Sequence, residues 1–104
     1  NLKKAQLINQ MIQETKEIIL EHSLKSKIKK IMLFGSIIEN KLTIKSDIDI
    51  AVEFSDITKK QAFDFRKNIF GKVSNKIDIQ VFNFLPEKVK ESVIKKHKIL
   101  YKNE

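Results

Sequence analysis

Three aspartates have a spacing that permits joint chemistry on a phosphoryl group. Asp47 and Asp49 lie two residues apart in an alternating segment, 47–54, and Asp78 lies in a second alternating segment, 76–82. Side chains two residues apart on a strand point to the same face of a sheet, and Asp78 has the same phase relative to its apolar neighbours. If the two strands are neighbours, three carboxylates project from one sheet face into one place.

Such a cluster is expected to bind metal ions. Clustered carboxylates repel one another and are driven towards protonation unless a cation sits among them. Oxygen ligands without nearby His or Cys favour Mg²⁺ or Mn²⁺, and this chain contains no Cys. Two such ions about 3.5–4 Å apart can hold the attacking and leaving oxygens of a phosphoryl displacement. We therefore expect two Mg²⁺ ions, with Mn²⁺ as the substitute.

A glycine and a serine supply a candidate phosphate contact. Gly35-Ser36 directly follows the apolar segment 29–34. Glycine lets the backbone come close to a phosphate, and Ser36 can donate its hydroxyl and its main-chain N–H to the same anion. Alone, this dipeptide fits a turn and helix cap equally well. Ser46 is a further candidate nucleotide contact, and it fits equally a residue that starts the strand or one that orients Asp47.

The elements that must position these residues follow from periodicity. Apolar spacing predicts a first helix over 2–22. A second helix of about a dozen residues should begin at the Thr58–Gln61 capping box and end near Gly71, its C′ residue. A third should begin at Pro86. Strands are predicted over 29–34, 47–54 and 76–82, with 98–101 as a short edge strand. We expect one α+β domain over residues 1–104, a small mixed sheet of three to five strands with helices packed on one face and the aspartates on the open face. Among the phenylalanines, Phe70 is expected in the core, whereas Phe63 and Phe84 fall off the inward phase and predict an exposed patch for a partner.

Composition narrows the class of protein. The 104 residues are 41% hydrophobic and carry a net charge of +8, but Arg66 is the only arginine. Bidentate recognition of phosphate or guanine favours arginine, so the lysine-rich surface is interpreted as solvated and nucleic acid is not an expected partner. No apolar run is long enough for a membrane span, no signal peptide is visible and there is no Cys, so the expected location is the cytoplasm, with no membrane association.

The stretch from Gly35 to Val52, GSIIENKLTIKSDIDIAV, resembles the signature of the minimal nucleotidyltransferases of the DNA polymerase beta-like superfamily. That signature is Gly-Ser, a spacer, then Ser-Asp-x-Asp. The ten residues 37–46 between Gly-Ser and the first aspartate match the common family spacing, and Asp78 fits the third carboxylate of the family. The resemblance covers nearly the whole chain and implies the nucleotidyltransferase fold.

The resemblance also implies a reaction. Asp47 and Asp49 would hold the two metal ions, and the triphosphate of ATP would lie on Gly35 and Ser36. Asp78 would bind the catalytic metal ion and help to deprotonate an acceptor hydroxyl. That hydroxyl would attack the α-phosphate, and pyrophosphate would leave.

The chain departs from the family in the turn after Gly-Ser. Many members carry arginine at the position of Ile37 or Glu39 and glycine at the position of Asn40. A cationic phosphate contact is therefore missing here, which leaves triphosphate affinity open. Asn40 can adopt a positive φ, so the turn itself is expected to survive.

The resemblance implies a partner as well. Minimal nucleotidyltransferases are commonly encoded beside a small helical HEPN-domain protein, and the pair is a toxin and its antitoxin. The expected function is a type VII-like antitoxin, a metal-dependent protein adenylyltransferase that transfers AMP from ATP to a tyrosine of the HEPN ribonuclease toxin. One alternative is a catalytically weak or inactive antitoxin that acts by binding. Another, a small-molecule nucleotidyltransferase, is less favoured because the chain has no second domain to enclose a small substrate.

Overall fold

The computed structural model describes residues 2–40 and 47–103. The helices are α1 (Leu2–Leu20), α2 (Lys59–Phe70) and α3 (Glu87–Lys95), and the strands are β1 (Ile28–Phe34), β2 (Ile48–Phe54), β3 (Ile77–Val81) and β4 (Lys98–Lys102). Short 3₁₀ turns are η1 (Lys25–Lys27), η2 (Gly35–Ile37) and η3 (Phe82–Phe84). Every predicted helix and strand is present, with bounds shifted by a few residues at most. No helix in the described ranges is both long enough and apolar enough to span a membrane.

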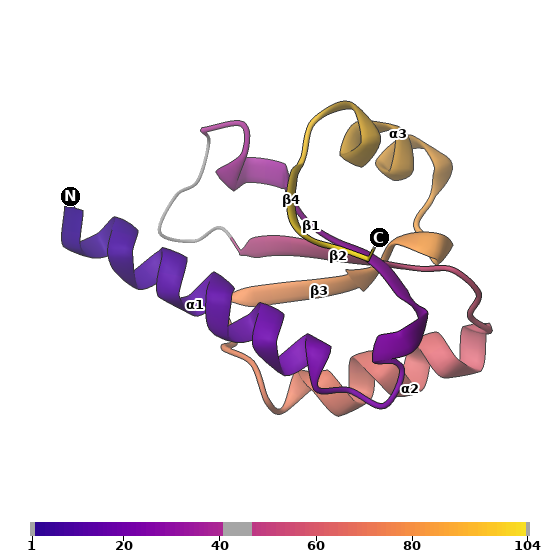
Figure 1. The fold of residues 1–104 in the computed structure, drawn as a ribbon. Helices are drawn as coiled ribbons and strands as arrows, with labels where there is room; N and C mark the ends of the chain where they lie inside the picture. The colour runs from indigo at the N-terminus through magenta and orange to yellow at the C-terminus, as the bar shows by residue number, and fades with distance from the viewer. Residues whose placement is uncertain (1, 41–46, 104) are drawn as a thin grey trace.

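The four strands form one mixed sheet in the order β3-β2-β1-β4 (Figure 1). β1 runs antiparallel to β2 and to β4, whereas β2 and β3 are parallel and are joined through α2. The parallel pairing matters for the site, because it places the two Asp-containing strands side by side in the same direction. The expected small mixed sheet is confirmed.

The helices divide between the two faces of the sheet. In Figure 1, α1 and α2 lie below the sheet and α3 lies above it. Alternate residues of β2 show the same division, since Ile50 belongs to the main core with α1 and α2, whereas Ala51 packs with Met32 and with Val93 of α3. The expectation that all helices pack on one face was therefore wrong. Met32 and Ala51 leave an apolar area on the second face, and α3 covers it.

Local signals place α2 against the sheet. The predicted capping box is confirmed, because Thr58 Oγ1 accepts from the Gln61 N–H at 3.1 Å and Gln61 Oε1 accepts from the Thr58 N–H at 3.0 Å. Gly71 follows the helix, but its φ of −85° is not the left-handed value expected of a C′ glycine. Phe65 and Ile69 are buried, whereas Phe70 is 85% exposed, so its assignment to the core was wrong. Phe70 lies one residue after Ile69 on the helix and therefore points away from the buried stripe.

One asparagine side chain joins η3 to the end of β2. Asn83 Nδ2 donates to the carbonyl of Phe54, and Asn83 Oδ1 accepts from the N–H of the same residue, both at 2.9 Å. The amide thus satisfies both backbone groups of a residue that is only 2% exposed.

We expect Asn83→Ala to lower the free energy of unfolding by about 2 kcal/mol, because two hydrogen bonds are lost and each contributes about 1 kcal/mol. Urea unfolding followed by circular dichroism measures this. Asn9→Ala, at an exposed position of α1, is the control and should change little. Equal midpoints for the two variants would show that the Asn83 contacts do not contribute.

Candidate active site

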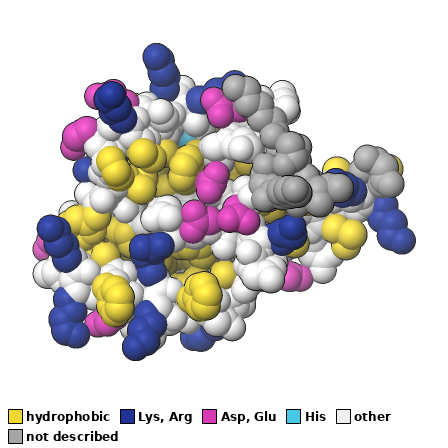
Figure 2. Space-filling model, turned by 180° about the vertical axis from the view of Figure 1, so that it is seen from behind, with side chains coloured by type: hydrophobic (Ala, Val, Ile, Leu, Met, Phe, Trp, Pro, Cys, Tyr) yellow, Lys and Arg dark blue, Asp and Glu magenta, His cyan; other side chains and the backbone are white. Residues whose placement is uncertain are grey.

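The parallel strands bring two of the three aspartates opposite each other. Asp49 of β2 is the register partner of Asp78 of β3, and Asp47 lies just before β2. Asp49 and Asp78 are half-buried, whereas Asp47 is exposed. Figure 2 shows acidic side chains gathered near the middle of one face of the molecule. The expected convergence of carboxylates from two neighbouring strands is therefore observed.

The cluster alters the acid–base properties of its central member. Burial, followed by the negative charges of Asp78 and then Asp47, raises the pKa of Asp49 from 3.8 to about 6. Desolvation is the larger cause of the raised pKa, and the like charges of the cluster add to it, because both disfavour the ionised carboxylate. A cation placed among these oxygens would reverse the effect.

The raised pKa of Asp49 predicts a pH dependence of stability in metal-free buffer. Between about pH 4 and pH 6 the folded protein binds more protons at this group than the unfolded chain does, so the stabilising contribution is present below pH 4 and is lost as the pH rises through 6. The melting temperature of the wild type should therefore fall over this range relative to that of Asp49→Asn, and the difference should be constant above pH 7. A difference that does not vary with pH would contradict the assigned pKa.

Gly35 lies directly against the central carboxylate. It follows Phe34, the register partner of Asp49, and its φ is +79°. A Cβ atom built on Gly35 would overlap Oδ2 of Asp49 and lie 3.2 Å from its Cγ. Only glycine fits this position without a shift of the carboxylate, so the Gly-Ser turn and the aspartate pair form one continuous site.

The turn after Gly35 is closed by two backbone hydrogen bonds, with neither arginine at Ile37 or Glu39 nor glycine at Asn40. The N–H groups of Ile38 and Glu39 both donate to the Gly35 carbonyl, at 3.0 and 3.1 Å. Asn40 has a φ of 57°, which confirms that it can take the left-handed conformation expected of it. Ile37 is partly buried against the core. Neither Ile37 nor Glu39 can supply the positive charge that arginine would bring at these positions.

Two serines, Ser36 and Ser46, were predicted to contact the nucleotide. Ser36 lies in η2 and is half-buried, one residue from Gly35. Ser46 lies outside the described residues, so its predicted contact with the nucleotide stays a prediction.

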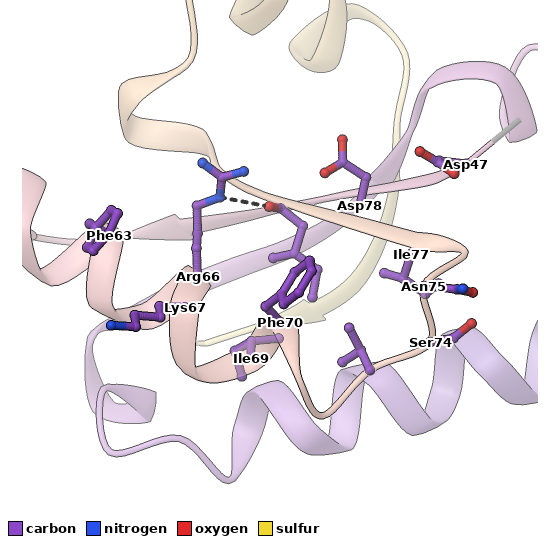
Figure 3. Close-up of a pocket in the computed structure, with 12 residues that line it drawn as sticks. Asp47, Phe63, Arg66, Lys67, Ile69, Phe70, Ser74, Asn75, Ile77 and Asp78 are labelled. Atoms are coloured by element: carbon purple, nitrogen blue, oxygen red, sulfur yellow. Dashed lines mark hydrogen bonds between the residues drawn. The ribbon is translucent and has the colours of Figure 1, made fainter.

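Two residues next to the aspartates were not singled out from the sequence. Gln80 donates its side-chain amide to both carboxylate oxygens of Asp78, at 3.3 and 3.2 Å, and so orients that side chain. Its place two residues after Asp78 on the same strand face was the available signal. Arg66 of α2 donates from Nε to the carbonyl of Ile79, at 3.1 Å, and its guanidinium lies beside β3 (Figure 3). The contact between Arg66 and β3 depends on how α2 packs, which periodicity alone does not give.

The donor set fits Mg²⁺, although no cage is preformed. Over residues 2–40 and 47–103, no three His, Cys, Asp or Glu side chains are placed to ligate one ion together. Mg²⁺ commonly takes one or two carboxylates, substrate phosphates and several waters, so a pair of facing carboxylates beside a phosphate site suits it. Asp49 and Asp78 meet that description, with Asp47 next to them.

Comparison with known proteins gives the family. The family model described as "Polymerase beta, Nucleotidyltransferase" matches residues 13–104. The chain belongs to the polymerase beta nucleotidyltransferase family. In this nucleotidyltransferase, the matched region includes the Gly-Ser turn, both Asp-containing strands and the helix between them.

A curated relative is named "Putative protein adenylyltransferase MJ1547" and comes from Methanocaldococcus jannaschii. The nucleotidyltransferase chain is 38% identical to it over 79 residues, which are 76% of this chain and 60% of the relative. The chain thus spans about three-fifths of the length of that relative.

Solved structures show the same fold. A chain in a crystal structure of a toxin–antitoxin pair with AMP-PNP has a TM-score of 0.66 at 20% identity, covering 88% of this chain and 74% of that one. A chain in a structure of the tri-AMPylated Shewanella oneidensis HEPN toxin in complex with MNT antitoxin has a TM-score of 0.61 at 24% identity, covering 90% and 73%. At these identities the likeness establishes the nucleotidyltransferase fold of this chain and nothing more specific.

Proposed function

We propose that this nucleotidyltransferase is a single domain over residues 1–104 that transfers AMP from ATP to a hydroxyl of a protein, and that the acceptor is a tyrosine of a HEPN-domain toxin. The observation that carries the proposal is the register of Asp49 against Asp78, with the backbone of Gly35 in contact with the Asp49 carboxylate. Two facing carboxylates beside a backbone that tolerates close approach suit a metal-bound triphosphate.

In the proposed reaction, Gly35 and Ser36 bind the triphosphate, and Ser46 is a further candidate contact. Asp47, Asp49 and Asp78 would hold Mg²⁺, which when bound neutralises phosphate charge and lowers the pKa of a coordinated hydroxyl. The acceptor oxygen forms a bond to the α-phosphorus, the bond from that phosphorus to the bridging oxygen breaks, and pyrophosphate leaves with the electron pair.

In this proposal, the carboxylate of Asp78 accepts the proton of the acceptor hydroxyl. Its carboxylate is half-buried and accepts two contacts from the Gln80 amide, so its orientation is fixed before the substrate arrives. A base held in one orientation near the acceptor oxygen is what general-base catalysis requires.

The HEPN partner is supported by the neighbours with known structures. One chain that matches this chain comes from a complex of an MNT antitoxin with a tri-AMPylated HEPN toxin, and another comes from a toxin–antitoxin structure with the ATP analogue AMP-PNP. The curated relative is named as a protein adenylyltransferase. We therefore propose the role of a type VII-like antitoxin for this chain.

One observation favours a second candidate, an antitoxin of the same fold that acts by binding with little catalysis. Ile37 and Glu39 stand where arginine commonly contacts the triphosphate, and Glu39 is exposed and acidic. A lower affinity for ATP would slow the transfer of AMP without affecting the binding of a protein partner.

Transfer of label from ATP decides between the two. The chain and its proposed HEPN-domain partner are incubated with Mg²⁺ and either α-³²P-ATP or γ-³²P-ATP. We expect the HEPN protein to be labelled from the α-phosphate only, because AMP rather than phosphate is transferred. No label from either nucleotide, with the two proteins still co-purifying, would exclude the enzyme and leave the binding antitoxin.

A further inference from the structure

A groove extends from the aspartates towards α2. It has a volume of about 810 Å³, and it is lined on one side by Asp47 and Asp78 and on the other by Phe63, Arg66, Lys67 and Phe70 of α2 (Figure 3). A smaller hollow of about 210 Å³ shares Phe63 and Arg66 and continues the groove along the same helix. We propose that this α2 groove binds the segment of the acceptor protein that carries the modified hydroxyl, an inference that rests on the proposed function.

The order of the strands gives the direction of approach. Gly35 follows β1, Asp49 is on the neighbouring β2, and Asp78 is on β3 at the edge of the described sheet. In a phosphoryl displacement the attacking and leaving oxygens lie roughly in line. With the triphosphate on the Gly35 side, the acceptor oxygen must arrive from the side of β3, which is where the α2 groove begins.

The apolar lining of the α2 groove suits a protein segment. The side chains of Phe63 and Phe70 are 66% and 85% exposed, which is high for phenylalanine. Figure 2 shows exposed hydrophobic side chains close to the acidic group on the same face. A helix of the length of α2 (Lys59–Phe70) spans about 18 Å, so its groove is long enough to hold several consecutive residues of a polypeptide. Aromatic side chains in such a position are frequent anchors of protein interfaces.

Charges define the chemistry of the occupant. Arg66 and Lys67 line the groove, and Arg66 is held in place by its hydrogen bond to the Ile79 carbonyl, which leaves its two terminal amino groups for another partner. A carboxylate on the bound segment would accept hydrogen bonds from both of these amino groups. The occupant is therefore an apolar polypeptide segment with an acidic side chain directed towards Arg66 and Lys67 on α2, away from Asp47 and Asp78.

The test measures binding and catalysis separately, with the proposed HEPN-domain partner as the probe. We expect Phe63→Ser and Phe70→Ser to raise the Kd for the HEPN protein at least tenfold, and to raise its KM in AMP transfer similarly, while the KM for ATP stays within twofold of the wild type. Ile94→Ser on α3 is the matched control, since Ile94 is 65% exposed and does not line the α2 groove, and it should leave all three values unchanged.

The same assays test whether the positive charges of the α2 groove contribute to binding. Lys67→Glu should raise the Kd for the HEPN protein, whereas Lys95→Glu in the last turn of α3 should not. Circular dichroism confirms that each variant is folded, and all the replaced side chains are exposed.

Several results would overturn the inference. Groove variants that bind the HEPN protein as tightly as the wild type would show that it docks elsewhere. A raised KM for ATP alone would assign the groove to the nucleoside, and loss of binding to a single-stranded RNA probe would assign it to nucleic acid. A wild type that binds no HEPN protein would also refute the docking. A wild type that binds HEPN through the groove but transfers no AMP would refute the proposed function and leave the docking intact.

Discussion

Replacing Asp49 by asparagine is expected to lower the rate of AMP transfer by about 10³-fold. Asp49 faces Asp78 across the two parallel strands and lies against Gly35, so it is the central ligand of the proposed site. A metal ion contributes several kcal/mol to stabilising the transition state, and about 4 kcal/mol corresponds to 10³ in rate. Asparagine keeps the size of the side chain but removes the charge that would hold the ion.

Single-turnover transfer of α-³²P-AMP to the HEPN protein measures this loss. Asp56→Asn is the matched control, because Asp56 is an exposed aspartate just beyond the other end of β2. We expect it to retain the wild-type rate. Asp49→Asn should also fail to gain thermal stability from Mg²⁺ and ATP, whereas the wild type should gain it. Full activity in Asp49→Asn would remove the aspartate pair from the mechanism.

Gly35→Ala is expected to reduce both stability and activity. A side chain at a φ of +79° costs about 1–2 kcal/mol, and the added Cβ overlaps Oδ2 of Asp49, so the carboxylate must move. A displacement of about 1 Å in a catalytic group can cost 10²-fold in rate, and we expect a loss of transfer of about that size.

The chain contains its own control for this substitution. Gly71 has a φ of −85°, and a Cβ atom added to it would have nothing within 4 Å, so Gly71→Ala meets neither obstacle. It should leave the transfer rate unchanged and alter the melting temperature only slightly. Similar losses in both variants would mean that the Gly35 contact with Asp49 has no special role.

The sequence predicted the elements where local chemistry determines them. Alternation identified β2 and β3, and the capping box identified the start of α2, because period-two burial and hydrogen-bonded caps are properties of short segments. The spacing of Asp47, Asp49 and Asp78 likewise predicted carboxylates that meet, since the two strands pair in parallel with the aspartates in register.

The features that it did not predict depend on contacts between distant segments. The side of the sheet that α3 covers is decided by the apolar area at Met32 and Ala51, which are far apart in the sequence. The exposure of Phe70 is an exception, since it follows from the place of Phe70 off the buried stripe of α2, whereas the packing of α2 against β3 decides the other features. The position of Arg66 beside Ile79 depends on the same packing, and so does the α2 groove.

The face of β2 that carries Asp49 also carries Ala51, two residues along. Ala51 is fully buried beneath α3, whereas Asp49 lies in the open acidic cluster. On this strand face, the residue that packs in the core, Ala51, is thus separate from the residue proposed to act in the reaction, Asp49. Mutation can erase the reaction without disturbing the core, and relief of charge repulsion would favour such loss. The aspartates can therefore be replaced one at a time to test the proposed reaction while the fold is preserved.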